Sequence, residues 1–167
     1  MLNIRNFTSY AKKTPFAPEW SYFIGEEIIS DINIKQLYSF LIKKEKQILK
    51  LKKTDDGFTG LKNHTTTRHG GYNLFSFKNK QITALKNVII KRHNEFLHTL
   101  NLKPVKDLYI NGWFNVMRKN EYIKPHAHSF GPDTYLGGHF CVSCENTSTY
   151  YINPINQIND PLTYESK

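Results

Sequence analysis

Cysteine is scarce in this 167-residue chain, and long apolar runs are absent. Two cysteines, Cys141 and Cys144, cannot build the disulfide framework of a small secreted protein, so we expect a reducing, cytoplasmic location. The longest apolar runs span a few residues, far below the ~20 that a membrane-spanning helix needs. The opening segment MLNIRNFTSYAKK also lacks the apolar stretch of a signal peptide. We therefore expect no association with a membrane.

Acidic residues are also few, because 14 Asp and Glu stand against 23 Lys and Arg, a net charge of +9. Such an excess can indicate nucleic-acid binding. Lysine supplies 19 of the 23 positive residues, however, and Asn and Ile are equally frequent at 16 each, which indicates a bias of the whole sequence. The densest run of lysines lies on the polar side of an amphipathic pattern and comprises Lys43, Lys44, Lys46, Lys50, Lys52 and Lys53. We read it as a solvated helix face and expect no nucleic-acid partner, with a phosphate or acidic-partner surface as the alternative.

Hydrophobic and aromatic contents of 39% and 14% are typical of a soluble globular chain, and the length favours one domain over residues 1–167. Two helical patterns are expected within a helical layer at about 26–103. Asn33 can cap the first helix, in the manner of a capping box with Gln36. Its apolar positions are Ile34, Leu37, Tyr38, Leu41, Ile42, Ile48, Leu49 and Leu51. The second helix has Ile82, Leu85, Ile89, Phe96 and Leu100 on one face and ends before Pro104. Residues 53–72 between them are typical of a loop.

The period changes to two from Leu108 onward, where apolar and polar or aromatic residues alternate through Met117. This alternation predicts a strand over 108–117, followed by a polar turn from Arg118 to Glu121. Further strands are expected at about 135–142 and 149–152. Helices first and strands second predict an α+β fold, with helices covering one side of a mostly antiparallel sheet.

The main chemical signal is the run Lys124-Pro125-His126-Ala127-His128. Two imidazoles at i and i+2 on an extended segment point to the same side, so they can grip one metal ion. Pro125 stiffens the approach because its ring fixes φ. A lone His-x-His pair also occurs among ordinary surface or core histidines.

The flanking residues carry a resemblance to a known family. The segment from Trp113 through Asn115 and Arg118 to Pro125-His126-Ala127-His128, followed by LGGHFCV at 136–142, resembles 2-oxoglutarate/Fe(II)-dependent oxygenases of the Pro-His-x-His type found in bacteria and phages. Tyr151-Ile152-Asn153-Pro154 is similar to that family's apolar-Asp-Pro segment, and YNLF at 72–75 also matches. The resemblance covers roughly residues 72–155.

The resemblance implies a double-stranded β-helix, a jelly-roll or cupin-like core from about residue 107 to 167, holding Fe(II). His126 would be the first metal ligand, and His128 would stand where a carboxylate is usual. The cosubstrates would be 2-oxoglutarate and O₂, with Asn115 helping to hold 2-oxoglutarate and Trp113 walling the pocket. The reaction would be hydroxylation of a C–H bond in a peptide, nucleic-acid component or small metabolite. A strand asparagine bonded to backbone and a core tryptophan are the structural alternatives for Asn115 and Trp113.

Several positions depart from the family pattern. Gly137 stands where Ser is usual, Cys141 where an aromatic is frequent, and Asn120 replaces a turn glycine, which Asn tolerates because it visits left-handed conformations. His139 shares a strand face with Gly137 and Cys141 if the period of two holds, so it points either into the pocket or away from it.

The family's third metal ligand, a histidine, and a basic residue for 2-oxoglutarate lie beyond the apolar-Asp-Pro segment. No histidine follows His139, and no arginine follows Arg118. We therefore expect a fragment or truncated chain with an incomplete ligand triad and low turnover by itself. Unpaired strand edges would favour self-association.

Two other functions stay open. Cys141 and Cys144 have zinc-like spacing and, with His126 and His128, would make a Cys₂His₂ structural site in a binding module. Alternatively, the β-helix is a catalytically inactive interaction domain.

Overall fold

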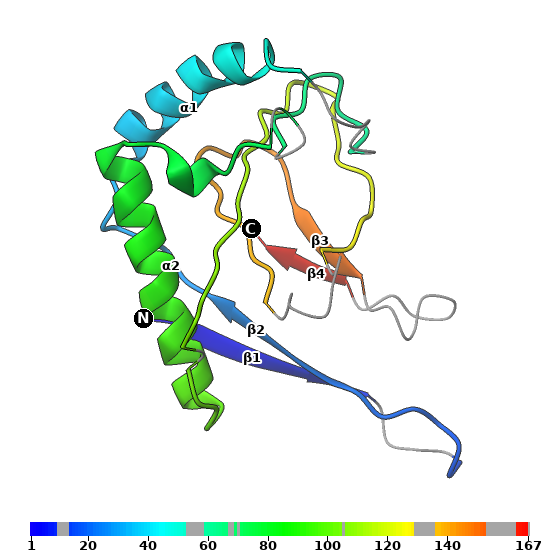
Figure 1. The fold of residues 1–167 in the computed structure, drawn as a ribbon. Helices are drawn as coiled ribbons and strands as arrows, with labels where there is room; N and C mark the ends of the chain where they lie inside the picture. The colour runs from blue at the N-terminus through cyan, green and yellow to red at the C-terminus, as the bar shows by residue number, and fades with distance from the viewer. Residues whose placement is uncertain are drawn as a thin grey trace. The chain divides into compact units, whose positions relative to one another are not determined.

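The computed structural model describes residues 1–9, 14–52, 59–66, 69, 71–104, 106–128 and 136–152, together with the backbone of 163–166. These residues belong to two compact units, each of which is described by itself. One unit is Ile29–Val142, and the other combines Met1–Ile28 with Ser143–Lys167. Within the described residues, neither helix combines the length and apolarity that crossing a membrane requires. Figure 1 shows the elements and their order.

The smaller unit contains two antiparallel strand pairs. Strands β1 (Asn3–Thr8) and β2 (Ser21–Glu26) pair from Asn3 opposite Glu26 to Thr8 opposite Ser21. Strand β3 (Thr149–Ile152) pairs with β4 (Thr163–Ser166). The strand expected at 149–152 is thus confirmed. The β1–β2 hairpin was not predicted, so the expected order of helices first and strands second is wrong at the N-terminus.

The larger unit contains both predicted helices, α1 (Ile34–Ile48) and α2 (Lys80–Thr99), and a short 3₁₀ helix, η1 (Leu74–Ser76). Asn33 caps α1 as predicted, because its side chain accepts from the backbone N–H of Gln36. The Asn33 N–H does not bond to the Gln36 side chain, as it would in a capping box. Gln81, in the first turn of α2, accepts from the Asn33 N–H at 3.0 Å and donates to the Gln36 side chain at 2.8 Å. Gln81 therefore ties the starts of the two helices together.

The apolar faces of both helices supply the core of this unit, as the periodicity predicts. The buried cluster consists of Ile32, Leu37, Leu41, Ile48, Leu74, Ile82, Leu85 and Phe114. Phe140 and Val142 pack against it from the chain after the His-x-His pair. Lys43, Lys46, Lys50 and Lys52 are exposed, in agreement with the solvated helix face. Lys44 instead lies over the rings of Phe40 and Phe77, at 5.7 and 4.8 Å from their centres.

The strand expected at 108–117 is wrong. The segment forms one isolated bridge, between Thr65 and Phe114, and no ladder. Its polar backbone groups are taken by other partners. The Asn73 side chain donates to Ile110 O and accepts from Gly112 N, Leu74 N donates to Gly112 O, and the Thr65 hydroxyl donates to Phe114 O. Side-chain bonds from Asn73 and Thr65, and one backbone bond from Leu74, thus replace strand pairing, and Figure 1 shows the segment as extended coil after α2.

The strand expected at 135–142 is also not formed over its described residues, 136–142. The polar turn at Arg118–Glu121 is confirmed, because Glu121 N donates to Arg118 O and Asn120 adopts a left-handed φ of 67°. The described parts of 53–72 form the predicted loop apart from the bridge residues Thr65 and His69. The described residues contain two two-stranded sheets, so the double-stranded β-helix and the single domain over 1–167 stay predictions.

Candidate functional site

The two histidines of the His-x-His pair come together as the sequence predicts. The Nε2 atoms of His126 and His128 lie 3.0 Å apart, and their ring centres are separated by 4.9 Å. His126 is exposed, whereas His128 is half-buried. Both rings therefore present the same nitrogen to one point near the surface of the larger unit.

The backbone around Lys124 orients this pair. His126 Nδ1 lies 2.8 Å from Lys124 O, and a carbonyl oxygen can only accept, so Nδ1 carries the proton and Nε2 of a neutral ring keeps its lone pair. Lys124 N donates to Thr59 O at 2.8 Å, which anchors the approach to the loop before it. Gly60 completes the contact with a left-handed φ of 81°, and a Cβ there would lie 3.0 Å from Lys124 Cγ.

His128 lies between an aromatic ring and a glycine. The indole of Trp113 meets the His128 ring edge-on with centres 5.2 Å apart, and a Cβ at Gly137 would lie 3.6 Å from His128 Nδ1. Desolvation, and secondarily the neighbouring His126, lower the pKa of His128 below its usual 6.5. The ring is thus held neutral at neutral pH, which is the form that binds metals.

The spacing of the two nitrogens fits a divalent transition metal. Two metal–nitrogen bonds of about 2.1 Å at a right angle place the nitrogens about 3.0 Å apart. The bond from His126 Nδ1 to Lys124 O is the outer-shell contact that metal-binding histidines usually make. Across the described residues, no cluster of three or more His, Cys, Asp or Glu side chains suits a metal ion. The described donor set is therefore a two-imidazole clamp.

Asn115, predicted to hold 2-oxoglutarate, is half-buried two residues after Trp113. Its Oδ1 atom is buried and has no hydrogen-bond partner among the described residues. No described backbone group therefore bonds this amide oxygen, and the strand in which the alternative places Asn115 is not formed. Trp113 is half-buried against His128, so it belongs to the surroundings of the histidine pair.

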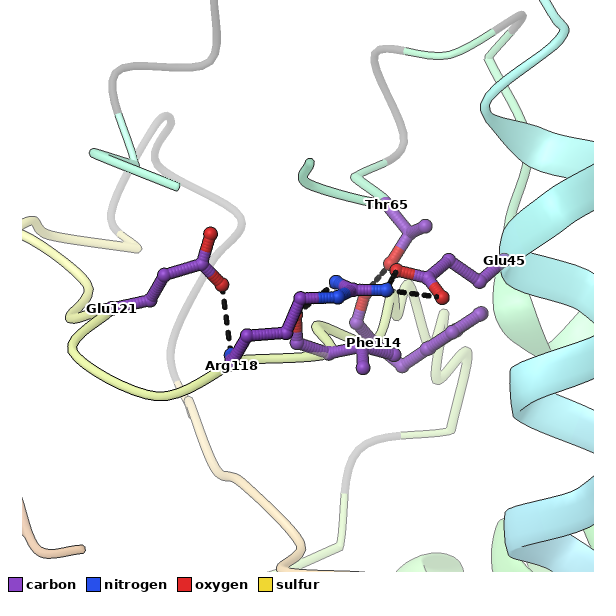
Figure 2. A network of polar contacts seen from close by, with 6 residues as sticks. Glu45, Thr65, Phe114, Arg118 and Glu121 are labelled. Atoms are coloured by element: carbon purple, nitrogen blue, oxygen red, sulfur yellow. Dashed lines mark hydrogen bonds and ion pairs between the residues drawn. The ribbon is translucent and has the colours of Figure 1, made fainter. Parts of the chain in front are cut away.

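A charged contact that the sequence pattern did not predict fixes the chain entering the site. Arg118 Nη2 donates to both carboxylate oxygens of Glu45 on α1, at 2.8 and 3.0 Å, and Arg118 N donates to Glu121 Oε2 at 2.8 Å (Figure 2). The Glu45 side chain is only 5% exposed, whereas Arg118 is 48% exposed. The signal was available, because Glu45 follows Leu41 by four residues on the apolar face of α1.

The remaining predicted residues do not join the pair. His139 is exposed, with its pKa lowered by partial desolvation, and the thiols of Cys141 and Cys144 are exposed and form no disulfide. Neither His139 nor Cys141 forms a three-member metal cluster with His126 and His128 in the described part of the larger unit. Cys144 belongs to the other unit.

In comparisons with known proteins, no family model, no curated protein and no solved structure matches the chain.

Proposed function

We propose that this protein is an Fe(II)- and 2-oxoglutarate-dependent oxygenase that hydroxylates a C–H bond. The observation that carries the proposal is the 3.0 Å separation of the His126 and His128 Nε2 atoms. The resemblance of residues 113–128 to the Pro-His-x-His oxygenases supplies the choice of iron and of 2-oxoglutarate. In such a reaction O₂ is divided between the product alcohol and succinate, and CO₂ leaves from the cosubstrate.

His126 and His128 would hold the iron, which when bound supplies the activation of O₂ and of the 2-oxo acid. Imidazole is a competent ligand for iron, and replacing a carboxylate by imidazole raises the charge of the site by one. This added positive charge favours an anionic cosubstrate such as 2-oxoglutarate, which carries two carboxylates.

The chain's own residues position the donors and shape their surroundings. Lys124 O fixes the tautomer of His126, so that Nε2 faces the ion. Trp113 shields one edge of His128 from water, which keeps that ring neutral. Asn115 is assigned to the cosubstrate because it lies two residues from Trp113 and its amide Nδ2 can donate to a carboxylate of 2-oxoglutarate, whereas its buried Oδ1 can only accept.

The proposal is tested by anaerobic titration of Fe(II) followed by 2-oxoglutarate. A chelate of iron by the 2-oxo acid gives a visible charge-transfer absorption, and we expect this band in the wild-type chain. His126→Ala and His128→Ala should abolish it, while His98→Ala, at an exposed position in the last turn of α2, should leave it unchanged.

Two results would contradict the proposal. Iron binding through both histidines without any spectral response to 2-oxoglutarate would reject the cosubstrate and indicate a metal-binding module. Absence of iron binding in every variant would reject the metal centre itself.

A further inference from the structure

The extended segment 110–115, which carries two residues of the proposed site, is held by the side chain of Asn73. The amide nitrogen of Asn73 donates to Ile110 O at 2.8 Å, and its amide oxygen accepts from Gly112 N at 3.2 Å. The same oxygen accepts from Phe75 N at 3.0 Å, at the start of η1. Asn73 thereby ties the segment to the 3₁₀ helix.

Thr65 holds the same segment two residues further along. Its side chain is fully buried, and its hydroxyl donates to Phe114 O while its own carbonyl accepts from the Tyr72 hydroxyl. Burial raises the pKa of Tyr72 well above its usual 10.0, so this hydroxyl keeps the proton that it donates. Phe114 also lies in the buried core cluster, so both its ring and its carbonyl are fixed.

Fixing Phe114 sets the direction of its two neighbours in the chain. Phe114 forms an antiparallel bridge with Thr65, and successive side chains of extended backbone point to opposite faces. Trp113 and Asn115 therefore share the face opposite to the Phe114 ring. The Trp113 indole meets the His128 ring edge-on, with centres 5.2 Å apart. A rotation of the segment about its own axis would move both side chains together.

The two proposed metal ligands are anchored by other contacts. Lys124 N donates to Thr59 O at 2.8 Å, and His126 Nδ1 bonds to Lys124 O at 2.8 Å. Neither contact uses the Thr65 hydroxyl or the Asn73 amide. Separate hydrogen bonds thus hold the metal ligands and the segment that carries Trp113.

We propose that Thr65 and Asn73 are positioning residues of the oxygenase site. They set the orientation of Trp113 and Asn115, and through Asn115 they determine the affinity for 2-oxoglutarate, whereas iron binding depends on the histidine pair. The inference rests on the proposed function for its cosubstrate. The orientation of Trp113 against His128 is measurable without iron or 2-oxoglutarate.

The first test is anaerobic titration of two matched variants. Thr65→Val keeps the shape of the side chain and removes its hydroxyl, whereas Thr65→Ser keeps the hydroxyl. Thr65→Val should leave Fe(II) affinity unchanged and weaken 2-oxoglutarate binding, read from the charge-transfer band, by roughly 10–100-fold, the range typical for loss of an outer-shell contact. Thr65→Ser should restore wild-type binding. A folded Thr65→Val chain that loses iron and 2-oxoglutarate equally, or neither, would overturn the proposal.

Histidine-ring NMR of the metal-free chain measures the orientation directly. The indole of Trp113 shifts the ring-proton signals of His128, and Trp113→Ala defines where these signals lie without it. Thr65→Val should move the His128 signals toward that position, and Thr65→Ser should keep them at the wild-type position. Unchanged His128 signals in Thr65→Val would overturn the positioning role.

The same spectra verify that each variant is folded, through the amide signals of α1 and α2. If Thr65→Val does not fold, Asn73→Asp takes its place in both measurements, with the same expected and contrary results. This variant keeps the acceptor oxygen for Phe75 N and Gly112 N and loses the donor to Ile110 O.

The two proposals fail separately. A wild-type chain that binds no 2-oxoglutarate rejects the oxygenase, and the NMR comparison still tests how Thr65 positions Trp113. A wild-type charge-transfer band that Thr65→Val leaves unchanged rejects the positioning role alone.

Discussion

At the scale of single residues, the surroundings of His128 make a prediction about its proton. Desolvation, and secondarily His126, lower the pKa of His128 below 6.5. The folded chain therefore binds fewer protons there than the unfolded chain, so this residue's contribution to stability falls as the pH drops below 6.5. Titration of the histidine ring protons by NMR should give a midpoint for His128 below 6.5.

Trp113→Ala should raise the titration midpoint of His128 toward 6.5, because the edge of the His128 ring regains contact with water. Tyr38→Ala, at an exposed position on α1 of the same unit, provides the control and should leave it unchanged. A His128 midpoint at or above 6.5 in the wild-type chain would be inconsistent with a desolvated ring.

Gly112 offers a second residue-scale test. A Cβ at this position would lie 2.5 Å from Phe75 Cε2, and Phe75 packs against the core, so the ring must shift. Gly112→Ala should reduce the free energy of unfolding by about 1–3 kcal/mol in chemical denaturation. Gly138→Ala is the matched control, because nothing lies within 4 Å of its added Cβ. Equal stability of the two variants would show that the close packing of Gly112 is wrong.

At the scale of elements, the Glu45–Arg118 contact joins α1 to the turn before the histidines (Figure 2). Arg118→Ala leaves the buried Glu45 carboxylate unpaired and should lower the free energy of unfolding by about 2–3 kcal/mol. This is toward the low end for buried pairs because Arg118 is half-exposed. Replacing both residues, as in Glu45→Met/Arg118→Met, should recover most of that loss, since no charge is then left buried.

The i,i+3 pair Arg92–Glu95 on α2, whose carboxylate is far more open to solvent than that of Glu45, is the control for this cycle. Glu95→Ala should change the free energy of unfolding by no more than about 0.5–1 kcal/mol. Additive losses at Glu45 and Arg118, measured by denaturant unfolding, would mean that the two side chains are not coupled.

At the scale of the whole molecule, the two units should differ in local stability. A two-stranded hairpin is marginal by itself, and most residues of β1 and β2 are exposed, whereas α1 and α2 bury their apolar faces in a shared core. Hydrogen exchange should therefore be slower in the two helices than in β1 and β2. Equal protection would show that the hairpin shares the stability of the core.

The sequence predicted the features that depend on local pattern. The periods of Leu37, Leu41 and Ile48 and of Ile82 and Leu85 located both helices, and the i, i+2 spacing brought His126 and His128 together. It failed at 108–117, where alternation indicated a strand. There, Asn73 and Thr65, more than 35 residues earlier in the chain, take the backbone groups of the segment. Such distant side-chain bonds, like the Glu45–Arg118 contact, leave no local signal in the segment that they bind.

The most direct test of the proposed metal centre is a double-mutant cycle of Fe(II) affinity at His126 and His128, measured anaerobically by calorimetry. If the two imidazoles bind one ion, each single Ala variant should lose about 100-fold or more in Fe(II) affinity. The double variant should bind Fe(II) little worse than either single variant. Wild-type affinity in either single variant, or independent losses that multiply in the double variant, would contradict a shared ion.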